Sequence, residues 1–254
     1  MRPQRVKRIR IELGAPSPRC GCAEFGLNCT FSVIHSKSHP RVTGWMTDIL
    51  ELPDGVRLAR LEEIPGPDTD RSPVWARLRN ARIAPGFTFV QSPPGERFRG
   101  YAEINVNASE IWAVFRALCS ALLGPDVSLI AGDMDDEPVP IVSGDTSMIL
   151  NALEQHRYQL AHDGFLQFGL LYDQGDELAE VFVTPTKHFK VWLNDENRFR
   201  SLMYDHGLPQ RETMEFVDEY PRVTTRLSED RGVLLHGEEF WKHLSNLIDG
   251  TKMH

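Results

Sequence analysis

The sequence lacks the features that would place it in a membrane or in the secretory pathway. No apolar run approaches the roughly 18 residues that a helix needs to cross a bilayer. The basic stretch at Met1–Arg8 is not followed by the apolar region of a secretory signal. The chain has only four cysteines, Cys20, Cys22, Cys29 and Cys119. Without a signal we expect reduced thiols and a cytoplasmic protein.

Signatures of catalysis are also missing. There is no Gly-x-Ser-x-Gly elbow for a nucleophilic serine and no glycine-rich loop that would hold a phosphate. The nine histidines are scattered, and none can be paired with a nucleophile from its spacing. Cys119 falls on the apolar side of a predicted helix, which favours a core residue over a reactive thiol. The sequence is therefore more typical of a non-enzymatic protein than of an enzyme.

Charge is distributed unevenly along the chain. Residues 1–100 contain 16 Lys and Arg against 10 Asp and Glu, whereas residues 101–254 contain 12 against 26. The two parts thus have net charges of +6 and −14 within a total of −8. An acidic second part is a poor binder of nucleic acid but a good partner for a basic protein. The basic cluster Lys7, Arg8 and Arg10 is too short to change that expectation.

The first part of the chain is predicted to be rich in strands. Its apolar runs are short and either alternate with polar residues or contain many β-branched and aromatic residues. These predicted strands are Val6–Leu13, Thr30–Ile34, Val56–Leu61 and Phe87–Val90. We expect an exposed loop at Pro65–Pro73 and a domain boundary at Ser92–Gly95, where the charge changes sign. The predicted domains are a basic, β-rich one at 1–92 and an acidic α+β one at 93–254.

The second part alternates predicted strands and helices. The predicted strands are Tyr101–Val106, Val127–Ala131, Phe165–Tyr172, Ala179–Val183, Phe189–Leu193 and a short one at Phe216–Val217. The predicted helices are one capped by Asn107 and Glu110, one from Asp145 through Leu160, one from Asn194 to Gly207 and one from Gly237 to Gly250. This order predicts an α+β fold with three or four helices packed on a mainly antiparallel sheet.

One acidic loop could hold a metal ion. Asp133, Asp135 and Asp136 follow the predicted buried strand Val127–Ala131, and carboxylates two residues apart can share a divalent cation such as Mg²⁺ or Mn²⁺. A metal-dependent transferase or hydrolase is the alternative function that this loop predicts. A solvated acidic loop before Pro138 explains the same residues and is favoured, because no phosphate-binding motif accompanies them.

Two other groups of residues could form sites. Cys20, Cys22, Cys29 and His35, with His39 nearby, have side chains that zinc prefers, but the Cys-x-Cys spacing disfavours a zinc site. Reduced core cysteines and surface histidines are the simpler interpretation. Lys187, His188 and Lys190 predict a strand with one basic face, for which a solvated surface is again the simpler interpretation.

Acidic and aromatic residues predict a surface that binds a protein. The candidates are Asp173, Asp176, Glu177, Glu180, Trp192, Glu215, Asp218, Glu219 and Tyr220, with Glu212 and Tyr172 nearby. Aromatic anchors within complementary charge are typical of protein interfaces. The sequence thus predicts a non-enzymatic, bacterial-type protein-binding module, such as an immunity protein that neutralises a basic toxin. The partner is expected to be a basic protein and neither nucleic acid nor a membrane.

Overall fold

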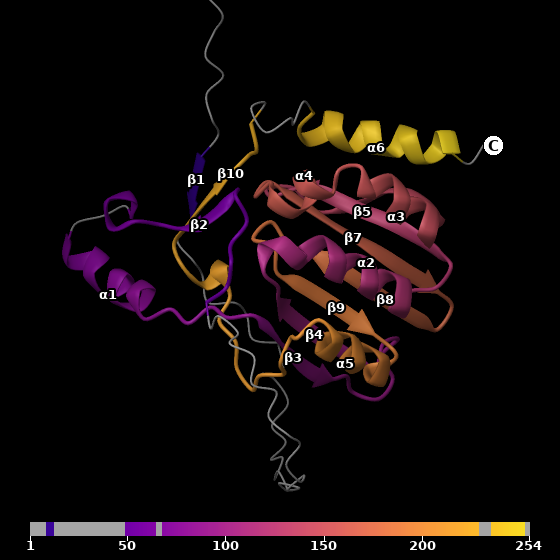
Figure 1. Ribbon diagram of the computed structural model, residues 1–254, viewed down its shortest axis with the longest axis horizontal. Helices are drawn as coiled ribbons and strands as arrows, with labels where there is room; N and C mark the ends of the chain where they lie inside the picture. The colour runs from indigo at the N-terminus through magenta and orange to yellow at the C-terminus, as the bar shows by residue number, and fades with distance from the viewer. Residues whose placement is uncertain (1–8, 13–48, 65–67, 229–234, 252–254) are drawn as a thin grey trace, which may run out of the picture.

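The computed structural model describes residues 9–12, 49–64, 68–228 and 235–251 (Figure 1). Most of the described chain builds an antiparallel sheet of seven strands in the order β3-β4-β9-β8-β7-β5-β6. The strands are β3 (Gly86–Gln91), β4 (Gly100–Asn105), β5 (Asp126–Asp133), β6 (Val139–Asp145), β7 (Leu166–Gln174), β8 (Glu177–Val183) and β9 (Phe189–Leu193). With the helices that pack on it, this sheet confirms the predicted α+β fold.

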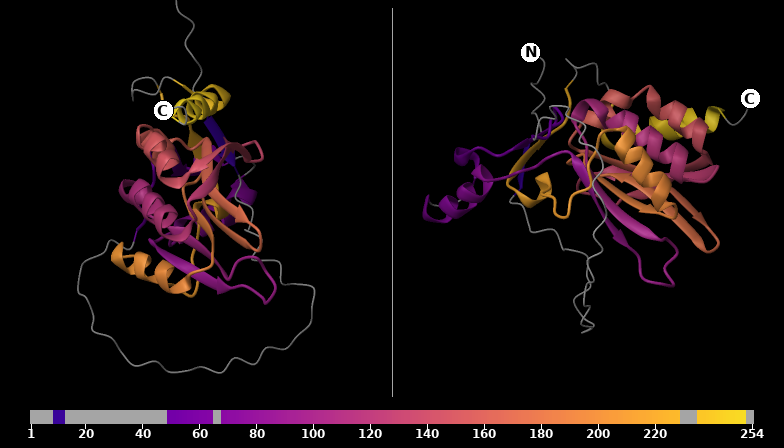
Figure 2. Two further views of the ribbon diagram at one scale, coloured as in Figure 1. Left: turned by 90° about the vertical axis from the view of Figure 1, so that its right-hand side faces the viewer. Right: turned by 60° about the horizontal axis from the view of Figure 1, so that its bottom comes forward.

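Helices cover one face of this sheet. They are α2 (Ile111–Leu122), α3 (Thr146–Glu154), α4 (Arg157–His162), α5 (Glu196–Asp205) and α6 (Gly237–Thr251). Figure 2 shows these helices on one side and the strands on the other. Alternate strand residues such as Leu129, Val181 and Val191 are fully buried beneath them, together with Phe115 of α2. The main core therefore lies between the sheet and one helical layer.

Several helix ends are placed by local signals in the sequence. Asp145 accepts hydrogen bonds from the backbone N–H groups of Ser147 and Met148, so it caps α3 as predicted. Asp195 caps α5 in the same way, and Gly207 follows that helix with φ of +67°. The predicted helix through Leu160 is divided into α3 and α4.

A smaller sheet lies beside the main one. It contains β1 (Ile9–Glu12), β10 (Arg222–Thr225) and β2 (Val56–Leu58) in the antiparallel order β1-β10-β2. With α1 (Asp68–Arg79) it surrounds a second apolar cluster that includes Val56, Leu78, Val217 and Tyr220. The seven-stranded sheet and its helices contact this smaller sheet at α4.

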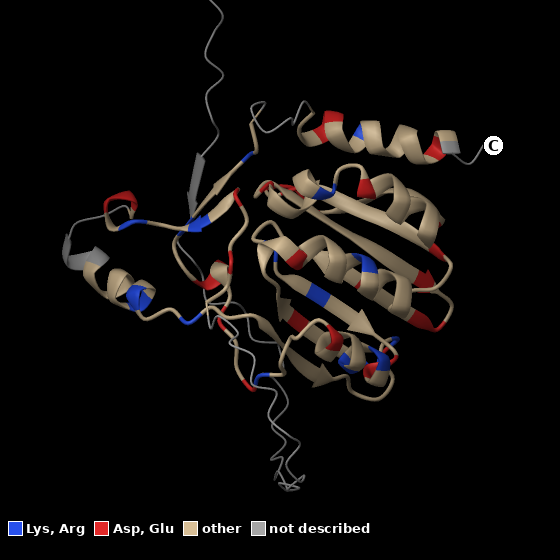
Figure 3. Ribbon diagram, viewed as in Figure 1, with Lys and Arg blue, Asp and Glu red and all other residues tan. Residues whose placement is uncertain are grey.

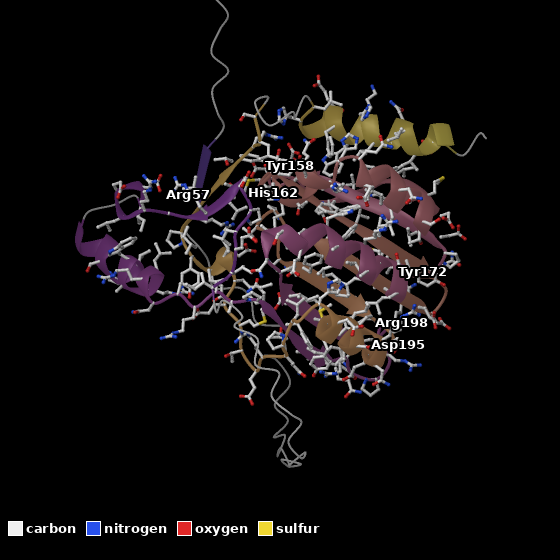
Figure 4. All side chains as sticks on the ribbon, in the orientation of Figure 1. Arg57, Tyr158, His162, Tyr172, Asp195 and Arg198 are labelled. Atoms are coloured by element: carbon white, nitrogen blue, oxygen red, sulfur yellow. The ribbon has the colours of Figure 1, made fainter. Side chains whose placement is uncertain are left out.

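Contacts at α4 show how closely the two units approach. Tyr158 donates a hydrogen bond of 2.7 Å to Asp54 and stacks on His162 at 4.5 Å between ring centroids (Figure 4). Nearby, a Cβ on Gly164 would lie 2.4 Å from the carbonyl oxygen of Gly55. Glycine is therefore required where these two backbones meet.

Two sequence predictions need correction, and two strands were missed. The segment expected as a loop at Pro65–Pro73 enters α1 at Asp68, and Pro73 stands inside that helix. Val74, Trp75 and Leu78 of α1 pack on the second core, and this tertiary packing outweighs the local effect of proline. The run Phe216–Val217 leads into a 3₁₀ turn, η3 (Val217–Glu219), instead of a strand. Strands β6 and β10 were not predicted.

The predicted domain boundary falls in a hairpin turn. Ser92–Gly95 connects β3 and β4, and Pro93, Pro94 and Gly95 are exposed as expected. Six residue pairs join these two strands, and β1 pairs with β10 from the far end of the chain. Both predicted halves thus contribute strands to both sheets, and the division at 92 stays a prediction.

Within the described ranges, no helix combines the length and the apolar character needed to cross a bilayer. The residues proposed for zinc, Cys20, Cys22, Cys29, His35 and His39, and the strand predicted at Thr30–Ile34, lie outside the described residues.

Candidate partner-binding surface

The face of the seven-stranded sheet opposite the helices, here called the open face, displays the other set of alternate side chains. Strand register places seven of them side by side in one row across the sheet. From β3 to β6 the row is Val90, Tyr101, Trp192, Glu180, Leu171, Ser128 and Ser143. This row contains aromatic, acidic, apolar and hydroxyl groups in sequence, so the chemistry of the open face changes from one edge to the other.

Aromatic side chains dominate one end of the row. Tyr101 and Trp192 are directly opposite each other on β4 and β9, with ring centroids 5.0 Å apart and an interplanar angle of 51°. Both rings are partly exposed, and the neighbouring Val90 is 53% exposed. A cross-strand aromatic pair presents a large, rigid apolar surface.

Glu180 occupies the centre of the row. It lies between Trp192 on β9 and Leu171 on β7 and is half-buried. Burial raises the pKa of its carboxyl group to about 7. Within the described chain no hydrogen bond or ion pair engages this carboxylate. A carboxylate that has lost part of its hydration without gaining a cation is well prepared to bind one.

A second row lies beside the first. Glu103 of β4 is directly opposite Lys190 of β9, and Lys190 is in turn opposite Phe182 of β8. Gly169 of β7 follows, and a Cβ there would lie 2.8 Å from the Phe182 ring. The absence of a side chain at Gly169 therefore lets the Phe182 ring lie across β7.

The other end of the open face is hollowed. The hydroxyl groups of Ser128 and Ser143 lie 2.8 Å apart within a shallow pocket. The pocket is lined by Asp126, Val127, Ser128, Ser143, Gly144, Leu171, Asp173 and Gln174. Its polar hydroxyl and carboxylate groups continue the row beyond Leu171.

The structure brings five of the predicted partner-binding residues to this region. Glu180 and Trp192 are neighbours on the open face, and Asp173, Asp176 and Glu177 lie at the exposed end of β7 and β8. Acidic residues gather at this end of the sheet in Figure 3. Arg97 forms an ion pair with Asp173 at 2.5 Å, and the Asp173 carboxylate is therefore already paired.

The remaining candidates lie elsewhere and make internal contacts. Glu215 accepts a hydrogen bond from the backbone of Arg82. Asp218 accepts one from the hydroxyl of Thr186. Tyr220 is only 2% exposed in the second core. The structure thus separates these residues from Glu180 and Trp192.

Two more candidates are also held by internal contacts. Glu219, next to Tyr220, pairs with Arg77 at 3.5 Å. Tyr172 packs on the helix-covered side, where a Cβ on Gly124 would collide with its ring (Figure 4). Neither residue contributes to the open face.

The acidic loop proposed for a metal does not gather its carboxylates around one point. Asp133 forms an ion pair with Arg226, whose guanidinium lies 4.7 Å from the centre of the Phe165 ring. Asp135 and Asp136 are exposed. Over the residues that the structure describes, no group of three or more His, Cys, Asp or Glu side chains could hold a metal ion.

The structure also does not form the predicted strand with Lys187, His188 and Lys190 on one basic face. Only Lys190 lies on the open face, whereas Lys187 and His188 are buried in the turn between β8 and β9. The Lys187 ammonium donates a hydrogen bond of 2.7 Å to the carbonyl oxygen of Leu166, and burial lowers its pKa to about 7. These two residues therefore stabilise a turn beneath the surface.

Sequence reasoning did not identify Tyr101 or Leu171 as surface candidates. Both lie at alternate positions of correctly predicted strands, and the alternation that buries Ala102 and Leu170 places them on the opposite face. Which strand faces stand next to each other depends on the strand order, which local patterns do not contain.

Comparisons with protein-family models, curated proteins and solved structures find no match for this chain. A functional assignment therefore depends on the chemistry of its own surface.

Proposed function

We propose that this protein binds a basic partner protein through the open face of its seven-stranded sheet. The observation that supports the proposal most directly is the half-buried Glu180 carboxylate beside the partly exposed Tyr101 and Trp192 pair. Aromatic side chains supply apolar contact area at interfaces, and a carboxylate at their centre favours a positively charged partner.

The layout of the face also suits such a partner. Exposed acids at the end of β7 and β8, Asp176 and Glu177, would attract a basic surface over a longer range. The aromatic pair and Leu171 would then exclude water around Glu180, which strengthens any ion pair formed there. Long-range attraction and short-range recognition are thus assigned to neighbouring parts of one surface.

A basic toxin is one partner with the required chemistry. Covering such a toxin through this face in the cytoplasm would make the protein an immunity protein. Neutralisation needs only a stable complex, so no catalytic group has to be assembled on the open face.

The proposal is tested by capturing partners from a native lysate at low salt with the wild-type protein and with the double variant Tyr101→Ala, Trp192→Ala. The matched control is Tyr204→Ala, which removes a tyrosine that is 61% exposed on α5 in the helical layer. We expect a basic protein that the wild type and the control retain, that the double variant loses, and that added salt releases. Equal capture by the double variant would contradict the proposal.

Toxin neutralisation has a separate test. A basic toxin encoded beside this gene would be co-expressed with the wild type, the double variant or the Tyr204→Ala control, and cell growth would be measured. Growth restored by the wild type and the control but not by the double variant is expected. Protection by all three would place the interface elsewhere.

A further inference from the structure

Arginine, aromatic and carboxylate side chains recur together in this chain. Among the described residues, three arginines each lie over an aromatic ring and also pair with a carboxylate. They are Arg200 with Phe89 and Glu196, Arg226 with Phe165 and Asp133, and Arg77 with Tyr220 and Glu219. The guanidinium carbons lie 4.9, 4.7 and 5.0 Å from the respective ring centroids. The fold thus uses one combination of groups in three separate places.

On the open face, Glu180 and Trp192 present the same two kinds of group, and no arginine among the described residues lies over the Trp192 ring or pairs with Glu180. Glu180 is directly opposite Trp192, whose ring contacts that of Tyr101. We infer that Glu180, Trp192 and Tyr101 form a recognition site for one arginine side chain of the partner. This inference rests on the proposed function, because it names the group that the open face would bind.

Among the described residues, no cation pairs with Glu180. Lys190, in the next row, is directly opposite Glu103 and only diagonal to Glu180. On the other side, Arg97 pairs with Asp173. Burial alone accounts for the raised pKa of Glu180, and no neighbouring cation opposes it. An incoming cation would therefore meet an acid that no described residue has neutralised.

The shape of the site favours arginine over lysine. A guanidinium is planar, so it can stack on an indole or phenol ring while donating two parallel N–H groups to a carboxylate. It is also more weakly hydrated than an ammonium group, so less hydration is lost on a partly apolar face. Trp192 and Tyr101 offer the ring surfaces, and Glu180 offers the two acceptor oxygens.

The site can be tested without knowing the partner. The probes are Nα-acetyl-arginine methylamide and Nα-acetyl-lysine methylamide, each titrated into the full-length protein. The readout is the Trp192 indole N–H resonance, which is assigned by its loss in Trp192→Phe. We expect a saturable shift with the arginine probe, a smaller shift with the lysine probe, and loss of the arginine effect in Glu180→Gln. The matched control is Glu103→Gln, which makes the same change in the neighbouring row and should keep the shift.

The possible results separate this inference from the proposed function. Equal shifts with both probes, or no shift with the arginine probe, would overturn the inference even if the double variant still loses its captured protein. An arginine-specific shift that needs Glu180 supports the inference even if no basic protein is captured. Unchanged circular dichroism of Glu180→Gln would show that its effect is not a loss of folding.

Discussion

The two faces of the seven-stranded sheet are built from the same strands but differ in how far the described chain buries them. On β9, Val191 is fully buried under the helices, while the adjacent Trp192 is partly exposed on the open face. On β4, Ala102 is fully buried and Tyr101 is partly exposed. Alternation assigns each strand one face for packing and one for solvent. The comparison shows that large apolar groups occur on both faces, although the helices of the described chain cover only one of them.

The difference in burial between the two faces changes how much their apolar side chains stabilise the fold. Apolar groups on the covered face stabilise the fold because burial removes them from water. Val90, which is 53% exposed, gains little of that stabilisation, and Tyr101 and Trp192, which are partly exposed, gain only part of it. A contiguous exposed apolar patch is typical of an interaction site. The two faces should therefore respond in opposite ways to substitution, one in stability and the other in binding.

The largest expected effect is on the covered face. Phe199 of α5 is fully buried, with its ring centroid 5.3 Å from that of Phe87 in an edge-to-face arrangement. Phe199→Ala should lower the free energy of unfolding by about 3–5 kcal/mol, because it leaves a cavity under the helix. Urea denaturation measures the loss.

The comparison variant for this prediction is Tyr101→Ala on the open face. It should cost about 1–2 kcal/mol in the same urea experiment, because the ring is only partly buried and loses one cross-strand aromatic contact. Equal losses for Phe199→Ala and Tyr101→Ala would show that both faces are structural. They would also remove the reason for assigning binding to the open face.

A smaller effect is expected at the end of α5. Gly207 has φ of +67°, and no atom lies within 4 Å of a Cβ built there. Gly207→Ala should therefore cost about 1 kcal/mol through backbone strain alone. The matched control is Gly250→Ala in α6, where space is also open and no positive φ applies. In thermal melting, Gly207→Ala should have a lower melting temperature than the wild type. Gly250→Ala should have a higher one, because alanine favours a helix more than glycine does.

The hairpin at Ser92–Gly95 allows a test of the predicted domain boundary. Cleavage there is expected to have little effect on the association of the two parts of the chain. A specific protease site inserted between Pro94 and Gly95 lies in an exposed turn. After cleavage, the two pieces should elute together from a sizing column, because β3 and β4 remain paired from Gly86 to Gln91. Separate, folded pieces would instead support a domain boundary at 92.

Local signals in the sequence were sufficient to predict most elements of the seven-stranded sheet and its helices. Asp195 and Gly207 delimit α5, and alternation identified β7, β8 and β9, because these features depend on neighbours in the sequence. Strand β6 was missed because Pro140 and Gly144 interrupt an edge strand that exists through pairing with β5. Tertiary contacts, which no local pattern contains, determine such elements.

The candidate site was predictable only in part, for the same reason. Glu180 and Trp192 were identified by residue type, but their adjacency results from the pairing of β8 with β9. Tyr101 joins them through β4, a strand far away in the sequence. Glu219, by contrast, resembles an interface acid in the sequence but pairs with Arg77 of a helix that was not predicted. Strand order and distant ion pairs decide which acids remain available.

The last expected effect depends on pH and concerns the carboxylate at the centre of the open face. Burial raises the pKa of Glu180 from its ordinary value of 4.5 to about 7. Between these two pH values the folded state keeps a proton that the unfolded state has released, so stability falls as pH rises through this window. Glu180→Gln should thus melt like the wild type near pH 4 and at a higher temperature at pH 8. Glu103→Gln, which removes the carboxylate opposite Lys190, should show no such gain at pH 8. A melting difference for Glu180→Gln that does not grow with pH would contradict a desolvated carboxylate at this position. It would also remove the energetic reason for the open face to attract a cation.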